Sequence, residues 1–337
     1  MLKKMLVMIL SAVMSLCLLS GCSLTTKKIV YTVYPVGYLL HQLAGDTITV
    51  QSIQTDAIVQ RANIADDYQM ILEDASLFLH IGALEPYISL YSNEIRSYDI
   101  ETIDLSLKNS IYDFKRYTRA IVDGEVVYTI SDYYKGDVFK TIDVNEKDLY
   151  LWTDPISMVS MAREIKNWLQ NMYPEDAAFY EENFESLESS LILLDAQYTA
   201  LSTKLKEENK SVKFVSMTAS FGNWQRTYGI QVYPVILSKY GVLPNDQQLE
   251  EIKQRIKEDG VRYIANEPNM TEDMKELYDQ LVSELGLQSV ELSNLSSLSV
   301  TQQSEKMDYL SIMYENLAQL EVMASENSSS NDFLEGE

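Results

Sequence analysis

Residues 180–205 read YEENFESLESSLILLDAQYTALSTKL and place an apolar side chain at every third or fourth position. The apolar positions are Tyr180, Phe184, Leu187, Leu191, Leu194, Tyr198, Leu201 and Leu205. Because this spacing keeps side chains on one face of an α-helix, it predicts one helix over 173–209, opened by Pro174 and closed by polar residues. Such a helix runs about 54 Å, more than the width of one small domain. We therefore expect it to pack against two lobes, with a coiled-coil dimer as the alternative.

Short apolar runs alternate with helical stretches on both sides of this segment. In the first half, strands are expected at 29–34, 47–53 and 76–80, and helices at 36–44, 66–75 and 84–95. In the second half, strands are expected at 212–216, 230–235, 261–265 and 289–292, and helices at 221–228, 249–258, 272–285 and 303–323. This alternation is typical of βαβ units with a mainly parallel sheet.

The predicted fold class is therefore α/β, with two βα lobes of mainly parallel sheets joined by one long helix. The lobes are expected over 29–172 and 210–325, with a ligand cleft between them. Apolar runs around Val122-Asp123-Gly124-Glu125 predict a hairpin over 119–130, which we interpret as a surface insertion. The Ser/Asn/Glu-rich stretch 326–337 is expected to be a disordered tail.

The N-terminus has the pattern of a bacterial lipoprotein signal. Lys3 and Lys4 precede an apolar run over 5–19, which is too short to span a bilayer, and Leu19-Ser20-Gly21-Cys22 follows. We expect a signal peptide over 1–21, lipid (palmitate-type) attachment at Cys22 and a tether over 22–28. This places the mature chain on the outer face of the cytoplasmic membrane. An ordinary secretion signal with an incidental cysteine is the alternative.

The charge balance excludes several classes of ligand. The chain holds 50 acidic and 27 basic residues, a net charge of −23, which repels nucleic acid and anionic lipid surfaces. The chain has two cysteines, and the one other than Cys22, Cys17, lies in the predicted signal. The mature chain would therefore have neither a disulfide nor a cysteine metal site. We find no glycine-rich phosphate loop, serine elbow or free thiol, and expect no enzymatic activity.

Open parallel sheets bind ligands beyond the carboxyl ends of their strands. The candidate ligand loops are therefore those after the predicted strands: 54–63, 80–84, 216–220, 266–269 and 293–296.

Several stretches resemble the substrate-binding lipoproteins of zinc and manganese ABC importers. Residues 77–87, LFLHIGALEPY, are similar to the family's DLFVYNGAGLEPW; residues 151–155, LWTDP, to its VWLDP; and residues 174–183, PEDAAFYEEN, to its PENAAYYEKN. Shorter landmarks fall at 221–222, 228–229, 267–268 and 308–313. The resemblance covers nearly the whole mature chain. It implies two lobes with limited hinge motion, an ABC permease and ATPase as membrane partners, and a monomer.

The family's metal ligands, three histidines and an acidic residue, are replaced in this chain. Their positions fall on Gln60, Tyr150, Thr218 and Ser293 (or its neighbour Asn294), while Arg61 would add a positive charge. Zinc and manganese need about three or more imidazole, thiolate or carboxylate donors. We therefore expect no high-affinity metal at this site, and zinc or manganese only if another site exists.

Three further residues are weaker candidates. His80 ends a predicted strand and could give a single metal donor, whereas His41 is expected to be structural. Glu267 matches a family landmark and is a further cleft candidate, although structural hydrogen bonding is its expected role.

Three functions are consistent with this reading. The first is the substrate-binding component of a metal-type ABC importer with an altered or lost metal site. The second is a surface lipoprotein that uses the same scaffold for adhesion or sensing. The third is a binding protein for a non-metal solute, with Gln60, Arg61, Tyr150 and Thr218 as hydrogen-bonding groups.

Overall fold

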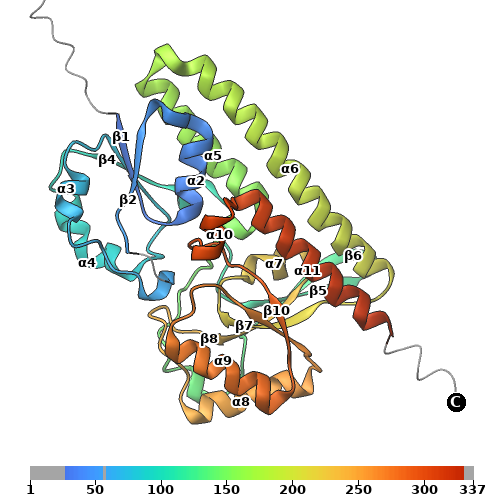
Figure 1. The fold of residues 1–337 in the computed structure, drawn as a ribbon. Coiled ribbons are helices and arrows are strands. Elements are labelled where there is room, and N and C mark those ends of the chain that lie inside the picture. Colours follow the sequence, from blue (N-terminus) through green and yellow to red (C-terminus); the bar gives the residue numbers. More distant parts are fainter. Residues whose placement is uncertain (1–26, 56–57, 330–337) are drawn as a thin grey trace, which may run out of the picture.

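The apolar stripe forms helix α6, Ala177–Glu207, which runs along one side of the molecule past both lobes (Figure 1). The computed structural model describes residues 27–55 and 58–329. All eight residues of the stripe are buried in the main core, which confirms the predicted face. The predicted signal over 1–21, Cys22 and residues 330–337 lie outside the described residues.

Helix α5, Pro155–Met172, packs beside α6 and was not predicted. Asp154 begins it, because its carboxylate accepts a hydrogen bond from the amide of Ile156 at 3.0 Å. Pro174 follows, and Pro174–Asp176 forms a 3₁₀ turn, so α6 begins four residues later than expected. The two helices therefore form an antiparallel helix pair that lies along the side of the molecule (Figure 1).

The N-terminal lobe is built on a parallel sheet with strand order β2-β1-β3-β4. The strands are β1 Lys28–Tyr31, β2 Thr49–Ser52, β3 Leu77–His80 and β4 Glu101–Asp104. The helices are α2 Tyr34–Ala44, α3 Tyr68–Leu72 and α4 Pro86–Ile95. Apolar residues of α2 pack with α5 and α6 in the main core, while those of α3 and α4 form a separate core on Val30 and Phe78. Helix α3 is shorter than predicted because Glu73 is extended and Asp74 has a φ of 61°.

The C-terminal lobe repeats this plan with the parallel strand order β10-β9-β7-β8. The strands are β7 Lys213–Thr218, β8 Gln231–Ile236, β9 Tyr263–Asn266 and β10 Gln288–Glu291. The helices are α7 Gly222–Tyr228, α8 Asp246–Glu258, α9 Glu272–Leu285, α10 Val300–Ser304 and α11 Tyr309–Ser329. The last predicted helix is split into two, because Lys306 has a φ of 56° and Asp308 then accepts a hydrogen bond from the amide of Ser311.

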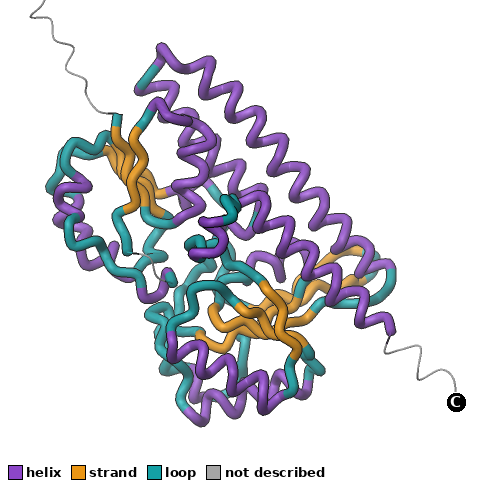
Figure 2. Tube along the Cα trace, in the orientation of Figure 1, coloured by secondary structure: helices purple, strands orange, loops and turns teal. Residues whose placement is uncertain are grey.

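The predicted hairpin forms strands β5 Arg116–Val122 and β6 Glu125–Ser131, the one antiparallel pair of strands among the named elements of the described chain. Its tip is exposed, but its base packs on the C-terminal lobe, where Tyr133 and Tyr134 join the core under α8 and α9. Figure 2 shows it beside the C-terminal sheet. Short 3₁₀ turns also occur at Gly45–Thr47, Val59–Arg61, Leu105–Lys108, Asp137–Phe139 and Leu151–Thr153.

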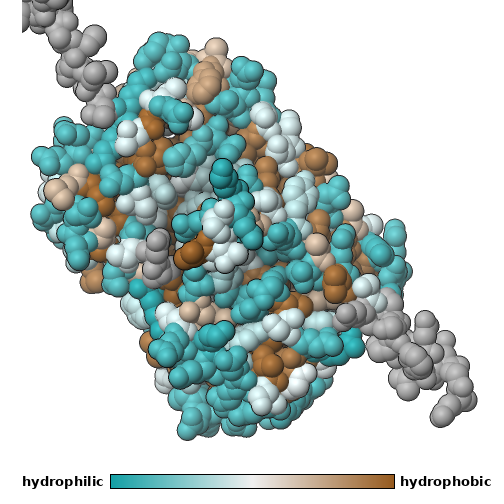
Figure 3. Space-filling view, in the orientation of Figure 1, coloured by the Kyte–Doolittle hydropathy of each residue, from teal (hydrophilic) through white to brown (hydrophobic). Residues whose placement is uncertain are grey.

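The α/β class with two parallel-sheet lobes and one long helix is thus confirmed. Hydrophilic residues cover most of the face seen in Figure 3, including the outer surface of α8 and α9. Across residues 27–55 and 58–329, no helix combines the length and apolar character needed to cross a bilayer.

The packing of α6 makes a direct prediction for two adjacent leucines. Leu194 is fully buried, whereas Leu193 is 56% exposed. Leu194→Ala should lower the free energy of unfolding by about 3 kcal/mol, because it removes buried methyl groups and leaves a cavity. Leu193→Ala is the matched control and should change it by about 0.5 kcal/mol or less. Urea unfolding measures both, and equal losses would contradict the observed face of α6.

Candidate interlobe site

The loops at the carboxyl ends of the two sheets meet between the lobes. The amide of Tyr34, after β1, donates to the carbonyl of Ser296, after β10, at 3.4 Å. The indole of Trp152 donates to the carbonyl of Asn294 at 2.7 Å. Because both parallel sheets point their carboxyl ends at this contact, it is the place where this architecture positions ligand groups.

Glu267 is the centre of this region and is only 3% exposed. One carboxylate oxygen accepts hydrogen bonds from the amides of Met217 and Thr218, at 2.6 and 3.0 Å. The other accepts from the Thr218 hydroxyl at 2.5 Å and the Asn294 side-chain amide at 2.8 Å. Burial raises the pKa of Glu267, while these four hydrogen bonds oppose the rise. The carboxylate therefore has its partners within the protein and ties together the ends of β7, β9 and β10.

Two of the four positions that our sequence analysis matches to the family's metal ligands contribute to this network. Thr218 contributes its hydroxyl, which also contacts the Ser220 hydroxyl at 2.6 Å. At the fourth position it is Asn294 that joins the network. The backbone of Ser293 instead bonds to the Asn316 side chain on α11. Its amide donates to the Asn316 side-chain oxygen, and its carbonyl accepts from the Asn316 side-chain amide, both at 2.9 Å.

Tyr150 is buried beside the network, edge-on to Trp152 with ring centroids 5.2 Å apart. Its hydroxyl makes no hydrogen bond of good geometry with the described residues. Burial raises its pKa, the Ser220 side chain opposes part of the rise, and the carboxylates of Asp148, Glu267 and Glu85 add to it. The phenol therefore lies in the field of carboxylates that belong to both lobes and stays neutral at physiological pH.

Glu85 is a fully buried carboxyl that the sequence analysis did not single out. It precedes α4, and neither of its oxygens makes a hydrogen bond of good geometry within the described chain; the same holds for the Thr32 hydroxyl beside it. Burial raises the pKa of Glu85 from 4.5 to about 7, with Thr32 opposing part of the rise. Thr32 also lines a polar pocket of about 200 Å³ together with Gln54 and Ser296, so the pocket draws on both lobes. Of these unsatisfied groups, Thr32 lines the pocket and can exchange a hydrogen bond with a small ligand there.

A second buried carboxyl, Asp148, supports the backbone of Tyr150. Its side chain accepts a hydrogen bond from the Tyr150 amide at 3.1 Å, and burial raises its pKa to about 7. A Cβ at Gly222 would collide with this carboxylate, which explains why the start of α7 has glycine there.

Gln60 and Arg61 lie on the turn Val59–Arg61, where Gln60 is buried and Arg61 crosses to the other lobe. The Arg61 guanidinium forms a two-pronged pair with Asp273, with both N–O distances 2.9 Å. It also donates to the carbonyl of Gly241 and the Thr271 hydroxyl. Arg61 holds the pKa of Asp273 down to about 2. The structure thus uses Arg61 to clamp the lobes together, with its charge already paired.

Neither of the two histidines takes part in the hydrogen bonds of the Glu267 network described above. His80 stacks on Phe78 with ring centroids 5.6 Å apart, and its Nδ1 lies 2.8 Å from the carbonyl of Gly82. His41 is exposed on α2. Among the residues that the structure describes, no group of three or more histidine, cysteine, aspartate or glutamate side chains is arranged to hold a metal ion.

Two parallel-sheet lobes that meet at their carboxyl ends, with one long helix along both, define a two-lobed solute-binding protein. Comparison with known sequences gives the family. The profile described as zinc-uptake complex component A, periplasmic, matches residues 29–323. The chain belongs to this family.

Individual relatives are distant. Zinc-binding protein AdcA of Streptococcus pyogenes is 27% identical over 177 residues, 51% of this chain and 32% of the relative. Zinc-binding lipoprotein AdcA of Streptococcus pneumoniae is 23% identical over 295 residues, 87% of this chain and 55% of the relative. High-affinity zinc uptake system protein ZnuA of Bacillus subtilis is 26% identical over 170 residues, 50% of this chain and 51% of the relative. The chain spans between about a third and about half of the length of these curated relatives.

Solved structures share the fold. Zn(II)-bound AdcA from Streptococcus pneumoniae superposes with a TM-score of 0.65 at 20% identity, covering 89% of this chain and 58% of that one. The periplasmic zinc-binding protein TroA from Treponema pallidum gives 0.67 at 15% identity, covering 88% and 98%. The laminin-binding protein Lmb of Streptococcus agalactiae gives 0.65 at 19% identity, covering 89% and 98%.

Glu85 makes a prediction about pH. A carboxyl whose pKa rises from 4.5 unfolded to about 7 folded favours folding at acidic pH, and this contribution is lost as pH rises through that window. Glu85→Gln removes the titrating group at nearly constant shape. It should raise the free energy of unfolding at about pH 8 by on the order of 2 kcal/mol and change it little at about pH 5.

Urea unfolding at both pH values measures this effect. Glu73→Gln is the control, because Glu73 is exposed and the chemical change is the same. If the wild-type protein and Glu85→Gln lose stability equally between the two pH values, the unpaired buried carboxyl is not what the structure shows.

Proposed function

We propose that this chain is the extracytoplasmic substrate-binding lipoprotein of a zinc/manganese-type ABC importer, and that its interlobe site takes a ligand other than these metals. Family membership supports the importer role, since proteins of the zinc-uptake complex work with an ABC permease and ATPase. The N-terminal pattern that ends at Cys22 supports a lipid anchor on the outer face of the cytoplasmic membrane, as does the lipoprotein AdcA among the relatives. We assign no catalytic step to the chain and expect it to act as a monomer.

The chemistry of the donor set carries the proposal on the ligand. Gln60, Tyr150 and Thr218 offer neutral oxygen or amide groups where zinc requires imidazole or carboxylate. Glu267 has a carboxylate of the right kind, but four internal hydrogen bonds already occupy it. Binding a cation there would break those bonds without supplying a second strong donor beside it.

A small polar solute that donates hydrogen bonds fits the remaining groups. Glu85, Thr32 and the Tyr150 hydroxyl all have unused acceptor capacity, and Thr32 lines the pocket between the lobes. A donor on the ligand would satisfy the buried Glu85 carboxyl, whose isolation from water costs free energy in the empty protein. Arg61 does not favour an anionic solute at this site, because its charge is paired with Asp273.

A surface lipoprotein for adhesion or sensing is the second candidate function. The Arg61–Asp273 ion pair favours it, because this pair holds the lobes together without a ligand. Lmb of Streptococcus agalactiae, whose structure is similar, is described as a bifunctional protein with adhesin and metal-transporting activity. The scaffold is therefore compatible with a binding role on its outer surface.

Calorimetry with zinc and manganese chloride on the metal-stripped protein tests the proposed loss of the metal site. We expect no submicromolar binding by the wild-type chain. The triple variant Gln60→His, Tyr150→His, Thr218→His restores three imidazoles and should gain zinc binding by at least about a hundredfold.

His80→Ala is the control for a residual site, and it should leave the wild-type titration unchanged. Submicromolar zinc binding by the wild-type protein would overturn the proposal, and its loss in His80→Ala would assign that binding to His80. Failure of a folded triple variant to gain affinity would show that these three positions do not correspond to the family's metal ligands.

A further inference from the structure

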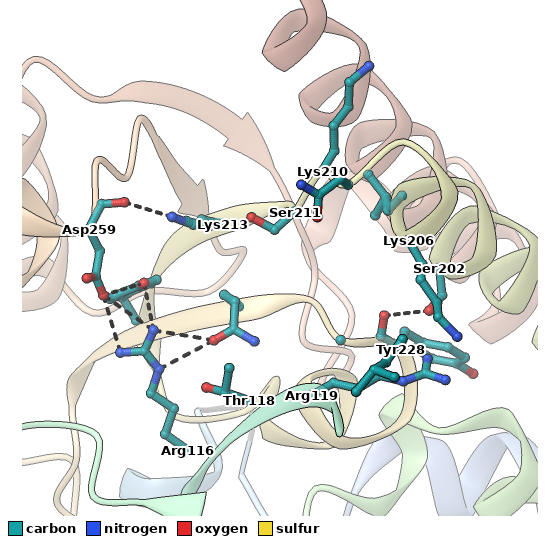
Figure 4. A pocket seen from close by; sticks show the side chains of 16 residues that line it. Arg116, Thr118, Arg119, Ser202, Lys206, Lys210, Ser211, Lys213, Tyr228 and Asp259 are labelled. Atoms are coloured by element: carbon teal, nitrogen blue, oxygen red, sulfur yellow. Dashed lines mark hydrogen bonds and ion pairs between the residues drawn. The ribbon is translucent and has the colours of Figure 1, made fainter. Parts of the chain in front are cut away.

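A pocket of about 570 Å³ opens where the C-terminal end of α6 approaches the hairpin (Figure 4). Its lining comes from β5, the end of α6 and the loop after it, the end of α7, the first half of β7 and β8, and Asp259 after α8. Five cationic side chains line it: Arg116, Arg119, Lys206, Lys210 and Lys213. Asp259 is the one acidic residue in the lining. We call this the basic pocket.

The charge of the basic pocket is opposite to that of the chain. The protein holds 50 acidic and 27 basic residues, yet this one concavity is lined by five cations and a single carboxylate. A concave surface with one sign of charge attracts counter-ions, because low-dielectric walls focus its field. A small anion is therefore favoured here, although the surface of the whole molecule repels anions.

Two of the five cations have carboxylate partners: Lys210 pairs with Glu208 at 2.8 Å, and Arg116 pairs with Asp259 at 3.3 Å. The Asp259 carboxylate accepts hydrogen bonds from the Tyr233 hydroxyl at 2.6 Å, from Arg255 at 2.8 Å and from Arg116 at 3.3 Å. The Lys213 ammonium donates a hydrogen bond to the backbone carbonyl of Asp259 at 2.9 Å, and this carbonyl carries no formal charge. The one anion of the lining is thus shared among several cations and has little capacity left.

Arg119 supplies an unused donor. Its Nε is buried and makes no hydrogen bond with any described residue. A buried N–H without an acceptor costs free energy, which an incoming oxyanion can recover. Guanidinium groups pair with phosphate oxygens through two parallel N–H bonds, so the geometry of arginine suits this ligand class.

The position of the pocket separates it from the interlobe site. Lys213 and Gln231 begin β7 and β8, whereas Thr218 and Glu267 lie at or beyond the carboxyl ends of their strands. The basic pocket therefore lies at the amino-terminal ends of the strands, and the interlobe site lies at their carboxyl ends. Lysines in the last turn of α6 compensate the helix dipole, but among the lining residues this accounts for Lys206 alone and not for the arginines of the β-hairpin.

We propose that the basic pocket is a second ligand site, which binds a small phosphate ester through Arg119 and Lys206. The ester is either free in solution or the headgroup of a phospholipid, since both present the same oxyanion. The volume lies within the range of small-molecule sites and exceeds what a single inorganic anion fills. Nucleic acid does not fit the proposal, because the net charge of −23 repels a long polyanion.

Calorimetry on the purified protein tests the site with two soluble probes, inorganic pyrophosphate and glycerol 3-phosphate. A sedimentation assay with phosphatidylglycerol vesicles tests a headgroup source. Arg119→Ala and Lys206→Ala should each weaken binding about tenfold, the loss typical of one charge-assisted hydrogen bond. Arg119→Lys should recover part of the affinity, because it keeps the charge and loses the planar fork.

Lys140→Ala is the matched control, since it removes an exposed lysine that does not line the pocket. Soluble-probe binding that falls in the pocket variants but not in this control supports a soluble ester. The same pattern with vesicles alone supports a headgroup. Absence of binding to every probe at millimolar concentration, or equal losses in the control, would overturn the proposal. Circular dichroism confirms that each variant is folded.

Discussion

The buried carboxylate of Glu267 is the constraint on which the centre of the molecule depends. It accepts hydrogen bonds from two consecutive amides at the end of β7 and from the side chains of Thr218 and Asn294. A buried carboxylate requires such partners, because an unpaired charge away from water is far costlier than a satisfied one. The carbonyl of Asn294 in turn holds the Trp152 indole, so this network also fixes the segment that carries Tyr150.

This arrangement explains how the scaffold of a metal-uptake family can lack a metal cage among its described residues. The lobes and the long helix keep the family's architecture, while neutral side chains stand at the positions that our sequence analysis matches to its ligands. The hydrogen-bonding capacity of Glu267 is used inside the protein, and Arg61 holds the lobes by pairing with Asp273. The groups that are still unsatisfied, Glu85 and Thr32, lie on the N-terminal side of the contact.

Sequence reasoning predicted most of the fold because the apolar periodicities are regular. The stripe of α6 is an example, since every residue that it contains is buried. Helix α5 was missed even though Met158, Met161 and Ile165 show the same spacing. The site was harder to predict. Glu85 is charged, so its complete burial contradicts the usual expectation for glutamate, and Arg61 meets Asp273 only through the packing of two lobes. The basic pocket gathers residues from 116 to 259, which no local pattern connects.

The most direct test of the account is a crystal structure of the protein grown with excess zinc, with anomalous scattering recorded at the zinc absorption edge. The account predicts no anomalous peak between the lobes, with the Glu267 oxygens still bonded to the amides of Met217 and Thr218. A strong peak beside Gln60, Tyr150 and Thr218, with Glu267 turned toward it, would contradict the central claim that the protein's own hydrogen bonds have taken the place of the metal.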